Sequence, residues 1–189
     1  MIYKALQFTS NLIDQFLKNT FSLDESKVVL NNLIDSDGSI PKNNQNKVVL
    51  SLINIEKETT RAFNTRNHQL GNGSYVNLNP EERFNVDILL SANFDDYSEA
   101  LKFINAIIIF FQVNTSLSAS NSSVIPKGIN KLEFDIEKLN YQQMHSLWTA
   151  MGAKYQPSVI YKMRLLTLQG FESNGFAASV SAIPSQVVQ

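Results

Sequence analysis

Residues that could bind a metal ion or act as acids, bases or nucleophiles do not form a recognised constellation in this sequence. Asp35, Asp37 and Gly38 are spaced like the start of a calcium-binding loop. That loop also needs a glycine at its sixth position and a glutamate at its twelfth, where this sequence has Ile40 and Asn46. We therefore interpret the segment as a plain turn.

The histidines and the closely spaced glycines lack the neighbours that chemistry would require. His68 and His145 have no Asp or Glu at metal-ligand spacing, so we expect both on the surface. Gly71 and Gly73 form G-x-G without the third glycine and the strand and helix of a phosphate-binding loop. The adjacent carboxylates at 95–96 precede a predicted helix, where capping is favoured over acid-base catalysis. With no serine on a nucleophile elbow, the sequence predicts no enzymatic activity, metal or cofactor.

Two further features each allow two interpretations. Lys162 and Arg164 share one face of a predicted strand. They could form a basic strip for an anionic partner, or they could pair with carboxylates such as Asp87 on a neighbouring strand. We favour pairing. Trp148 is either an interface anchor or a core residue, and its place on a helical apolar stripe favours the core.

Apolar periodicity predicts the elements that position these side chains. Spacing of three and four residues predicts helices at about 2–19, from 95 or 96 to about 112, and at 141–151. Alternation or β-branched composition predicts strands at 28–34, 47–58, 82–93, 132–136 and from 159 onward. The third helix has the clearest boundaries, because Asn140 and Gln143 fit a capping box and Gly152 fits a left-handed C-terminal position.

The second predicted helix is unusually apolar. One stripe along it consists of Tyr97, Leu101, Ile104, Ile108 and Phe111, and a second consists of Phe103, Ile107 and Phe110. A helix of this kind is expected to be covered on more than one side.

Three segments are too polar or too irregular to predict as regular elements. Residues 59–80 are rich in asparagine and glycine, and residues 113–130 are rich in serine, asparagine and threonine. Residues 171–189 have scattered apolar side chains without periodicity, so we expect a flexible C-terminal tail. The element order predicts a single α+β domain over 1–170, with a mixed or mainly antiparallel sheet flanked by helices.

The composition argues against two classes of partner. The 189 residues include 16 Lys and Arg and 17 Asp and Glu, for a formal net charge of -1. This balance gives no electrostatic reason to expect nucleic acid or an anionic membrane as a partner. The longest apolar run, near 107–111, is far shorter than the roughly 20 residues that span a bilayer.

Several segments together resemble the cap or tail-terminator proteins of extracellular contractile injection systems, of the antifeeding-prophage and Photorhabdus virulence cassette type. The resemblance is carried by the strand at 48–58, the helix block at 97–112, the unit Leu139, Leu147, Trp148 and Gly152, and the run at 157–162. It extends from about Ile2 to Leu168, and the asparagine-rich segment and the tail lie outside it.

The resemblance implies a fold like that of phage tail terminators and a structural, non-enzymatic role. Such a subunit would form a ring, expected to be a homohexamer, on the distal end of the tube and sheath and would end their polymerisation. Its partners would be copies of itself, the inner tube protein, the sheath protein and a paralogous cap protein. Assembly would take place in the cytoplasm, before the particle is released or becomes cell-associated. The alternative is an assembly adaptor or chaperone that binds a tube or sheath subunit.

The polar segment and the tail are the expected partner-binding regions, because they lie outside the predicted scaffold. The side chains that we expect to contact partners are Arg61, Asn64, Arg66, His68, Phe171, Phe176, Val180 and Ile183.

Overall fold

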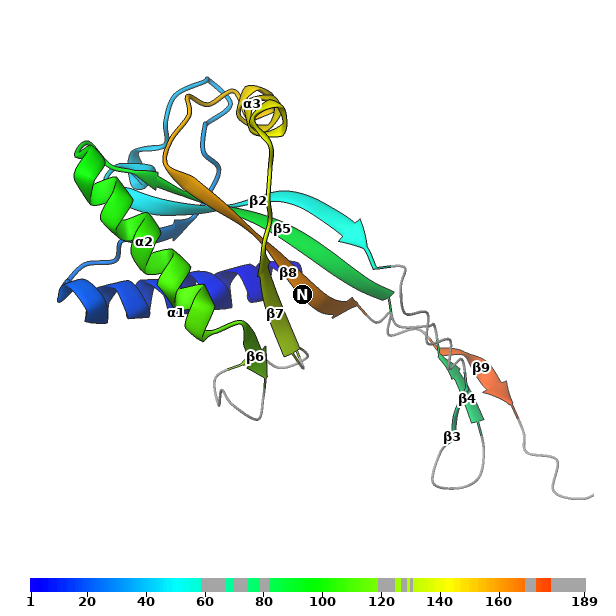
Figure 1. The fold of residues 1–189 in the computed structure, drawn as a ribbon. Coiled ribbons are helices and arrows are strands. Elements are labelled where there is room, and N and C mark those ends of the chain that lie inside the picture. The colour runs from blue at the N-terminus through cyan, green and yellow to red at the C-terminus, as the bar shows by residue number, and fades with distance from the viewer. Residues whose placement is uncertain are drawn as a thin grey trace, which may run out of the picture.

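The computed structural model of the chain describes residues 1–58, 67–69, 75–78, 82–118, 125–126, 129, 131–168 and 173–177 (Figure 1). Within these residues, the helices are α1 (Ile2–Phe21), the short 3-10 helix η1 (Lys42–Asn44), α2 (Tyr97–Val113) and α3 (Tyr141–Ala150). The strands are β1 (Val28–Leu30), β2 (Lys47–Lys57), β3 (Asn67–Gln69), β4 (Tyr75–Leu78), β5 (Glu82–Asn93), β6 (Ser116–Ser118), β7 (Lys131–Ile136), β8 (Ser158–Leu168) and β9 (Ser173–Ala177).

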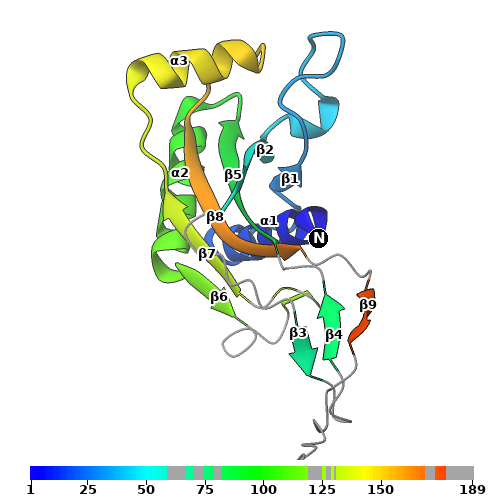
Figure 2. The same ribbon diagram turned by 90° about the vertical axis from the view of Figure 1, so that its right-hand side faces the viewer.

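The main sheet has six strands within the described residues, in the order β1-β2-β5-β8-β7-β6. Its β1–β2 pair is parallel, and its other neighbouring pairs are antiparallel. The predicted α+β class, with a mixed and mainly antiparallel sheet flanked by helices, is therefore confirmed. Figure 2 shows how β8 bends along its length.

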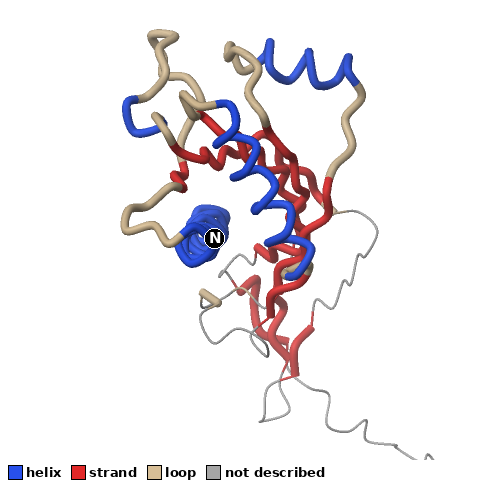
Figure 3. Tube along the Cα trace, turned by 60° about the vertical axis from the view of Figure 1, so that its left-hand side comes forward, coloured by secondary structure: helices blue, strands red, loops and turns tan. Residues whose placement is uncertain are grey.

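Helices cover both faces of this sheet. On one face, α1 and α2 pack over Val48, Leu50, Ile88 and other inward side chains to form the larger core. On the other face, α3 covers a smaller core around Val49, Leu89 and Ile160. Figure 3 shows α1 nearly end-on beside α2, with α3 set apart from both. The larger core thus lies under α1 and α2, and the smaller core lies on the α3 side of the sheet.

An aromatic cluster on α2 ties the larger core together. Phe111 is 2% exposed, and its ring centroid lies 4.0 Å from that of Tyr161 on β8 and 4.9 Å from that of Phe134 on β7. Phe110 lies 5.4 Å from Phe16 and so joins α2 to α1. Asp96 caps the start of α2 by accepting a hydrogen bond from the Ser98 amide at 2.8 Å, as the sequence predicted for residue 95 or 96.

Asp14 joins α1 to the start of β1. Its Oδ1 accepts hydrogen bonds from the Ser26 hydroxyl at 2.9 Å, the Lys27 amide at 2.8 Å and the Val28 amide at 3.0 Å. Burial alone would raise the pKa of the Asp14 carboxyl, but these hydrogen bonds, together with Lys18, outweigh burial and hold the pKa below 3.8. The carboxylate thereby stabilises the connection that leads into the sheet.

Replacing Asp14 by alanine is expected to lower the free energy of unfolding by about 2–3 kcal/mol, because partly buried donors lose their acceptor. The stability that the ionised Asp14 carboxylate contributes is fully present above pH 3.8 and is lost as the pH falls through its folded-state pKa. Chemical denaturation at pH 7 and in acid measures both effects. Asp24→Ala, which removes an exposed carboxylate nearby, is the control and should cost less than about 0.5 kcal/mol. Equal losses in the two variants would contradict the assignment.

The third helix begins and ends as predicted. Asn140 Oδ1 accepts a hydrogen bond from the Gln143 amide at 2.8 Å, and the Gln143 side chain accepts one from the Asn140 amide at 2.9 Å. These two bonds complete the capping box. Gly152 follows the helix with a φ of 67°, which glycine adopts without strain.

The first strand is shorter than predicted. It ends at Leu30 and not at Ile34. The last backbone hydrogen bond toward β2 is donated by the Asn31 amide to the Leu50 carbonyl, at 3.2 Å. Leu33 is 8% exposed and packs in the smaller core beneath α3. The apolar residues after Leu30 are thus buried by a helix on the far face, and they do not continue the strand.

A separate sheet of three strands, in the order β3-β4-β9, was not predicted. Strands β3 and β4 lie within the segment 59–80 that we expected to lack regular structure, and β9 lies within the expected tail. Parts of both segments thus form regular strands that the sequence did not predict, and the flexibility expected of the tail stays a prediction. Figure 1 shows this small sheet beyond the ends of β2 and β8, away from the helices.

Candidate interaction surfaces

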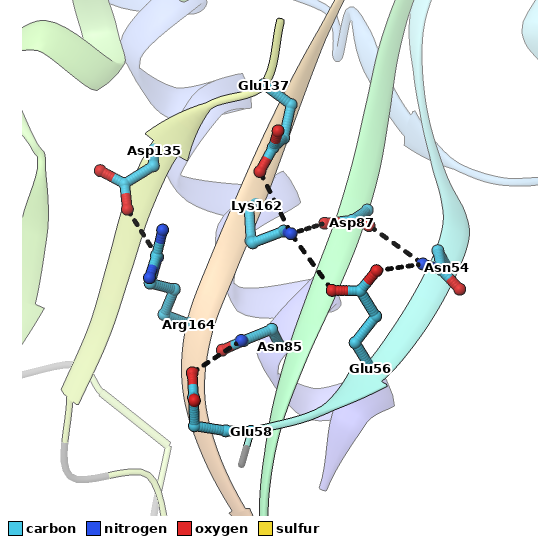
Figure 4. A network of polar contacts seen from close by, with 9 residues as sticks. All are labelled: Asn54, Glu56, Glu58, Asn85, Asp87, Asp135, Glu137, Lys162 and Arg164. Carbon is cyan, nitrogen blue, oxygen red and sulfur yellow. Dashed lines mark hydrogen bonds and ion pairs between the residues drawn. The ribbon is translucent and has the colours of Figure 1, made fainter. Parts of the chain in front are cut away.

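Beyond the area that α3 covers, the same face of the main sheet has a network of polar side chains, which we call the polar face (Figure 4). It comprises Asn54, Glu56, Glu58, Asn85, Asp87, Asp135, Glu137, Lys162 and Arg164. The strand order brings these side chains together, because β2, β5, β8 and β7 are successive neighbours in the sheet.

A β-bulge in β2 turns its polar side chains toward this face. Leu52 pairs with Ile88, but Asn54 and not Ile53 pairs with Asp87, so β2 has one extra residue there. After the bulge, Asn54 and Glu56 take the alternate positions that face Asp87 and Lys162 (Figure 4). Asn54 Nδ2 donates to Glu56 Oε1 at 3.0 Å and to Asp87 Oδ2 at 3.3 Å.

Lys162 lies at the centre of the polar face and has three carboxylates around it. Its Nζ is 3.2 Å from Glu56 Oε2, 3.2 Å from Glu137 Oε1 and 3.8 Å from Asp87 Oδ1. We call these four residues the Lys162 cluster. The predicted pairing of Lys162 with Asp87 is confirmed, and Arg164 pairs separately with Asp135, with Nε 2.7 Å from Oδ2.

Burial and neighbouring charges shift the pKa values of this cluster. Burial raises the pKa of the Asp87 carboxyl above 3.8, and Glu56 and Glu137 add to that effect while Lys162 and Asn54 oppose it. Burial alone would lower the pKa of Lys162. The hydrogen bonds to Glu137 and Glu56 and the charge of Asp87 outweigh burial, so the pKa of Lys162 is raised above 10.5. The ammonium therefore stays charged through the neutral range.

The raised pKa of Asp87 predicts a pH dependence of stability. A carboxyl with a raised folded-state pKa binds more protons in the folded protein than in the unfolded chain. The stability that this carboxyl contributes is therefore lost as the pH rises from 3.8 through its folded-state pKa. Asp87→Asn should gain stability relative to the unmodified protein as the pH rises across that window, as measured by denaturation at several pH values. Parallel profiles of the two proteins would contradict this prediction.

The underside of α3 is a second candidate surface. Trp148 is 4% exposed, and its ring centroid lies 5.5 Å from that of Tyr155 in an edge-on arrangement. A mainly apolar pocket of about 510 Å³ lies beside it, lined by Leu139, Tyr141, Met144, His145, Trp148 and Tyr155 among others. The predictions of a core Trp148 and of a surface His145 are confirmed.

The outer side of α2 is a third candidate surface. Tyr97 and Leu101 are 65% and 46% exposed, while Ile104 and Ile108 are partly buried against the larger core. The four residues recur at spacings of four, three and four, so they form one stripe on the helix. We call them the α2 stripe. The sheet and α1 both cover α2, as predicted for so apolar a helix, but Tyr97 and Leu101 stay exposed.

Two of the predicted partner-binding residues lie in register in the three-stranded sheet. His68 on β3 pairs with Val76 on β4, and Val76 pairs with Phe176 on β9. The other six lie outside the described residues, namely Arg61, Asn64, Arg66, Phe171, Val180 and Ile183.

Sequence reasoning missed Glu56 and Glu137 as members of the polar face. Their side chains are 50% and 32% exposed and lie on either side of Lys162. Glu56 is displaced toward this face by the bulge in β2, and no sequence periodicity marks that extra residue. A charged triplet at the end of an apolar strand was the only available signal.

The described residues contain no group of three or more histidine, aspartate or glutamate side chains that could hold a metal ion. In the same part of the chain, no helix combines the length and the apolar character needed to cross a membrane.

Comparisons with known proteins identify similar chains. Residues 8–181 match the family model of the Pvc16 N-terminal domain. This match includes the asparagine-rich segment and most of the predicted tail, which we had placed outside the resemblance. A search of curated proteins found no significant match.

Two solved structures share the fold. One is the PVC sheath/tube terminator of an extracellular contractile injection system in the extended state, with a TM-score of 0.64 and 13% identity over 94% of this chain. The other is the tube-terminating cap of the anti-feeding prophage, with a TM-score of 0.65 and 14% identity over 95% of this chain. The chain spans 62% and 60% of the lengths of those two proteins.

Proposed function

Because this chain belongs to the family of the Pvc16 N-terminal domain, we propose that it is a structural cap subunit of an extracellular contractile injection system. In this role it binds the distal end of the tube and sheath and ends their polymerisation. It acts through binding surfaces and not as an enzyme. Assembly takes place in the cytoplasm, and the subunit then remains part of the particle.

The observation that carries this proposal is the likeness of fold. Nearly the whole chain superposes on a sheath/tube terminator and on a tube-terminating cap, with TM-scores of 0.64 and 0.65. The family model independently covers residues 8–181. A fold can host several functions, so the surfaces of the subunit must also suit assembly.

The α2 stripe suits contact with a second copy in a ring, which we propose to be a hexamer. Exposed Tyr97 and Leu101 extend the apolar core outward, and burying them against a neighbour removes apolar surface from water. A head-to-tail contact of this kind closes into a ring when the rotation between neighbours fits. Closure explains how a cap binds a repeating tube end without itself growing into a filament.

We also propose that the two segments around the small sheet reach the partners. Residues 59–79 are directed toward the tube, and residues 171–183 contact a neighbouring subunit or the sheath. The register of His68 and Phe176 across β4 supports a shared location for parts of both segments. Limited proteolysis of free and assembled protein tests this idea, and equal cleavage in the two states would remove it.

Deleting the gene tests the proposed function directly. Loss of a terminator should give tubes or sheaths of uncontrolled length or unstable particles, as seen by electron microscopy. Expression of the unmodified protein from a plasmid should restore normal lengths. Loss of an assembly adaptor or chaperone would instead lower the yield of particles with normal ends, and that outcome would replace the cap proposal.

A further inference from the structure

Within the Lys162 cluster, carboxylates outnumber cations. One ammonium group contacts Glu56, Asp87 and Glu137 at 3.2–3.8 Å. Arg164, the other cation of the polar face, is already engaged by Asp135. With every group ionised, three carboxylates therefore share a single cation.

Two buried oxygen atoms on the same face have no hydrogen-bond donor within the described residues. Asp87 Oδ1 is 3.8 Å from Lys162 Nζ, which is too long for a hydrogen bond. Asn85 is 8% exposed, and its Oδ1 has no partner although its Nδ2 donates to Glu58 Oε2 at 2.9 Å. Buried acceptors without donors are unfavourable, so a rearrangement that supplies a donor is favoured.

The position of Lys162 explains why Asp87 lacks its donor. Glu56 and Glu137 hold the ammonium at 3.2 Å from opposite sides, and Asp87 lies farther away (Figure 4). A second cation that bound Glu56 and Glu137 would release Lys162 to close on Asp87. Binding would then both neutralise the excess charge and satisfy a buried acceptor.

The outer carboxylates are accessible to such a cation. The Glu56 and Glu137 side chains are 50% and 32% exposed, whereas those of Asp87 and Lys162 are 13% and 18% exposed. The described residues offer no group of carboxylates arranged to hold a metal ion. An extended organic cation that donates several hydrogen bonds fits two separated carboxylates better than a metal ion does.

We propose that the Lys162 cluster is the docking site for an arginine or lysine side chain of a partner protein in the assembled particle. This inference rests on the proposed function, because it takes the partner from the tube or sheath. The partner's cation contacts Glu56 and Glu137, and Lys162 moves toward Asp87. An arginine fits best, since its guanidinium can bind carboxylates through paired hydrogen bonds.

The test uses particles purified from cells that lack this protein, to which the purified protein is added back. Binding is measured by co-sedimentation at increasing concentrations of sodium chloride. The Glu56→Gln/Glu137→Gln double variant should bind about tenfold more weakly at low salt, and its affinity should depend less on salt. Glu56→Gln alone provides a milder variant, and thermal unfolding verifies that each protein is folded.

The matched control is the Asp24→Asn/Glu99→Gln double variant, which makes the same change in net charge at exposed positions away from the polar face. It should bind like the unmodified protein. If the unmodified protein binds and both double variants bind equally well with equal salt dependence, the docking site is wrong and the cap function stands. If the unmodified protein does not bind the particles, the proposed function fails and this inference fails with it.

A metal ion is tested separately as the competing occupant. Calorimetric titration of the isolated protein with calcium or magnesium should show no binding at this cluster. Binding that disappears in the Glu56→Gln/Glu137→Gln variant would overturn the proposal in favour of a cation site.

Discussion

Trp148→Ala is expected to lower the free energy of unfolding by about 3–5 kcal/mol, the range for removing a large buried aromatic side chain. Trp148 is 4% exposed and is the one residue of α3 that is buried, so it anchors the helix to the smaller core. Its loss would leave a cavity between α3 and the strands that carry Leu89 and Ile160. Urea denaturation of the purified variant measures the effect.

Trp148→Phe is the matched control. The indole Nε1 has no hydrogen-bond partner within the described residues, so phenylalanine loses contact area but no hydrogen bond. We expect it to cost well under half as much as alanine. If Trp148→Ala instead gave a stable, soluble protein that failed only to cap particles, Trp148 would belong to an interface and not to the core.

The second large effect is expected for Leu101→Glu, which should weaken association between subunits by about 2 kcal/mol, or roughly thirtyfold. The side chain is 46% exposed in the subunit, so the variant should fold normally. If the α2 stripe forms the proposed ring contact, the new carboxylate would be buried against apolar surface without a partner. Analytical ultracentrifugation with and without tube ends measures the change in association.

Lys102→Glu is the control for this prediction. Lys102 is exposed on the same helix, about 100° farther around its axis. It changes the surface charge in the same direction without placing a carboxylate in the α2 stripe. Equal weakening by both variants would indicate a general effect of charge, and no weakening by Leu101→Glu would place the subunit contact elsewhere.

Local signals made much of the fold predictable. Asn140, Gln143 and Gly152 define the ends of α3 through contacts within a few residues, and the sequence shows these directly. The apolar alternation of β5 correctly predicted that the strand begins at Glu82 and ends at Asn93. Such features depend on helical and strand geometry and not on which elements meet in space.

The features that were missed depend on distant pairing. Strand β4 pairs with β9, which lies about a hundred residues later in the chain, and neither strand has a strong apolar pattern. The pairing of Lys162 with Asp87 could be suggested from their strands. The positions of Glu56 and Glu137 required the strand order and the bulge, so the excess of carboxylates at the Lys162 cluster could not be predicted.

The bulge in β2 also predicts which changes in chain length the subunit can tolerate. Removing Ile53 would let Asn54 follow Leu52 directly and keep its pairing with Asp87, so regular pairing would be restored and every later residue of β2 would stay on its present side of the sheet. Inserting one residue after Asn54 would instead turn Ile55 toward the polar face and turn Glu56 to the opposite side of the sheet. Deletion of Ile53 should therefore be tolerated far better than an insertion after Asn54, because only the insertion takes a carboxylate away from Lys162.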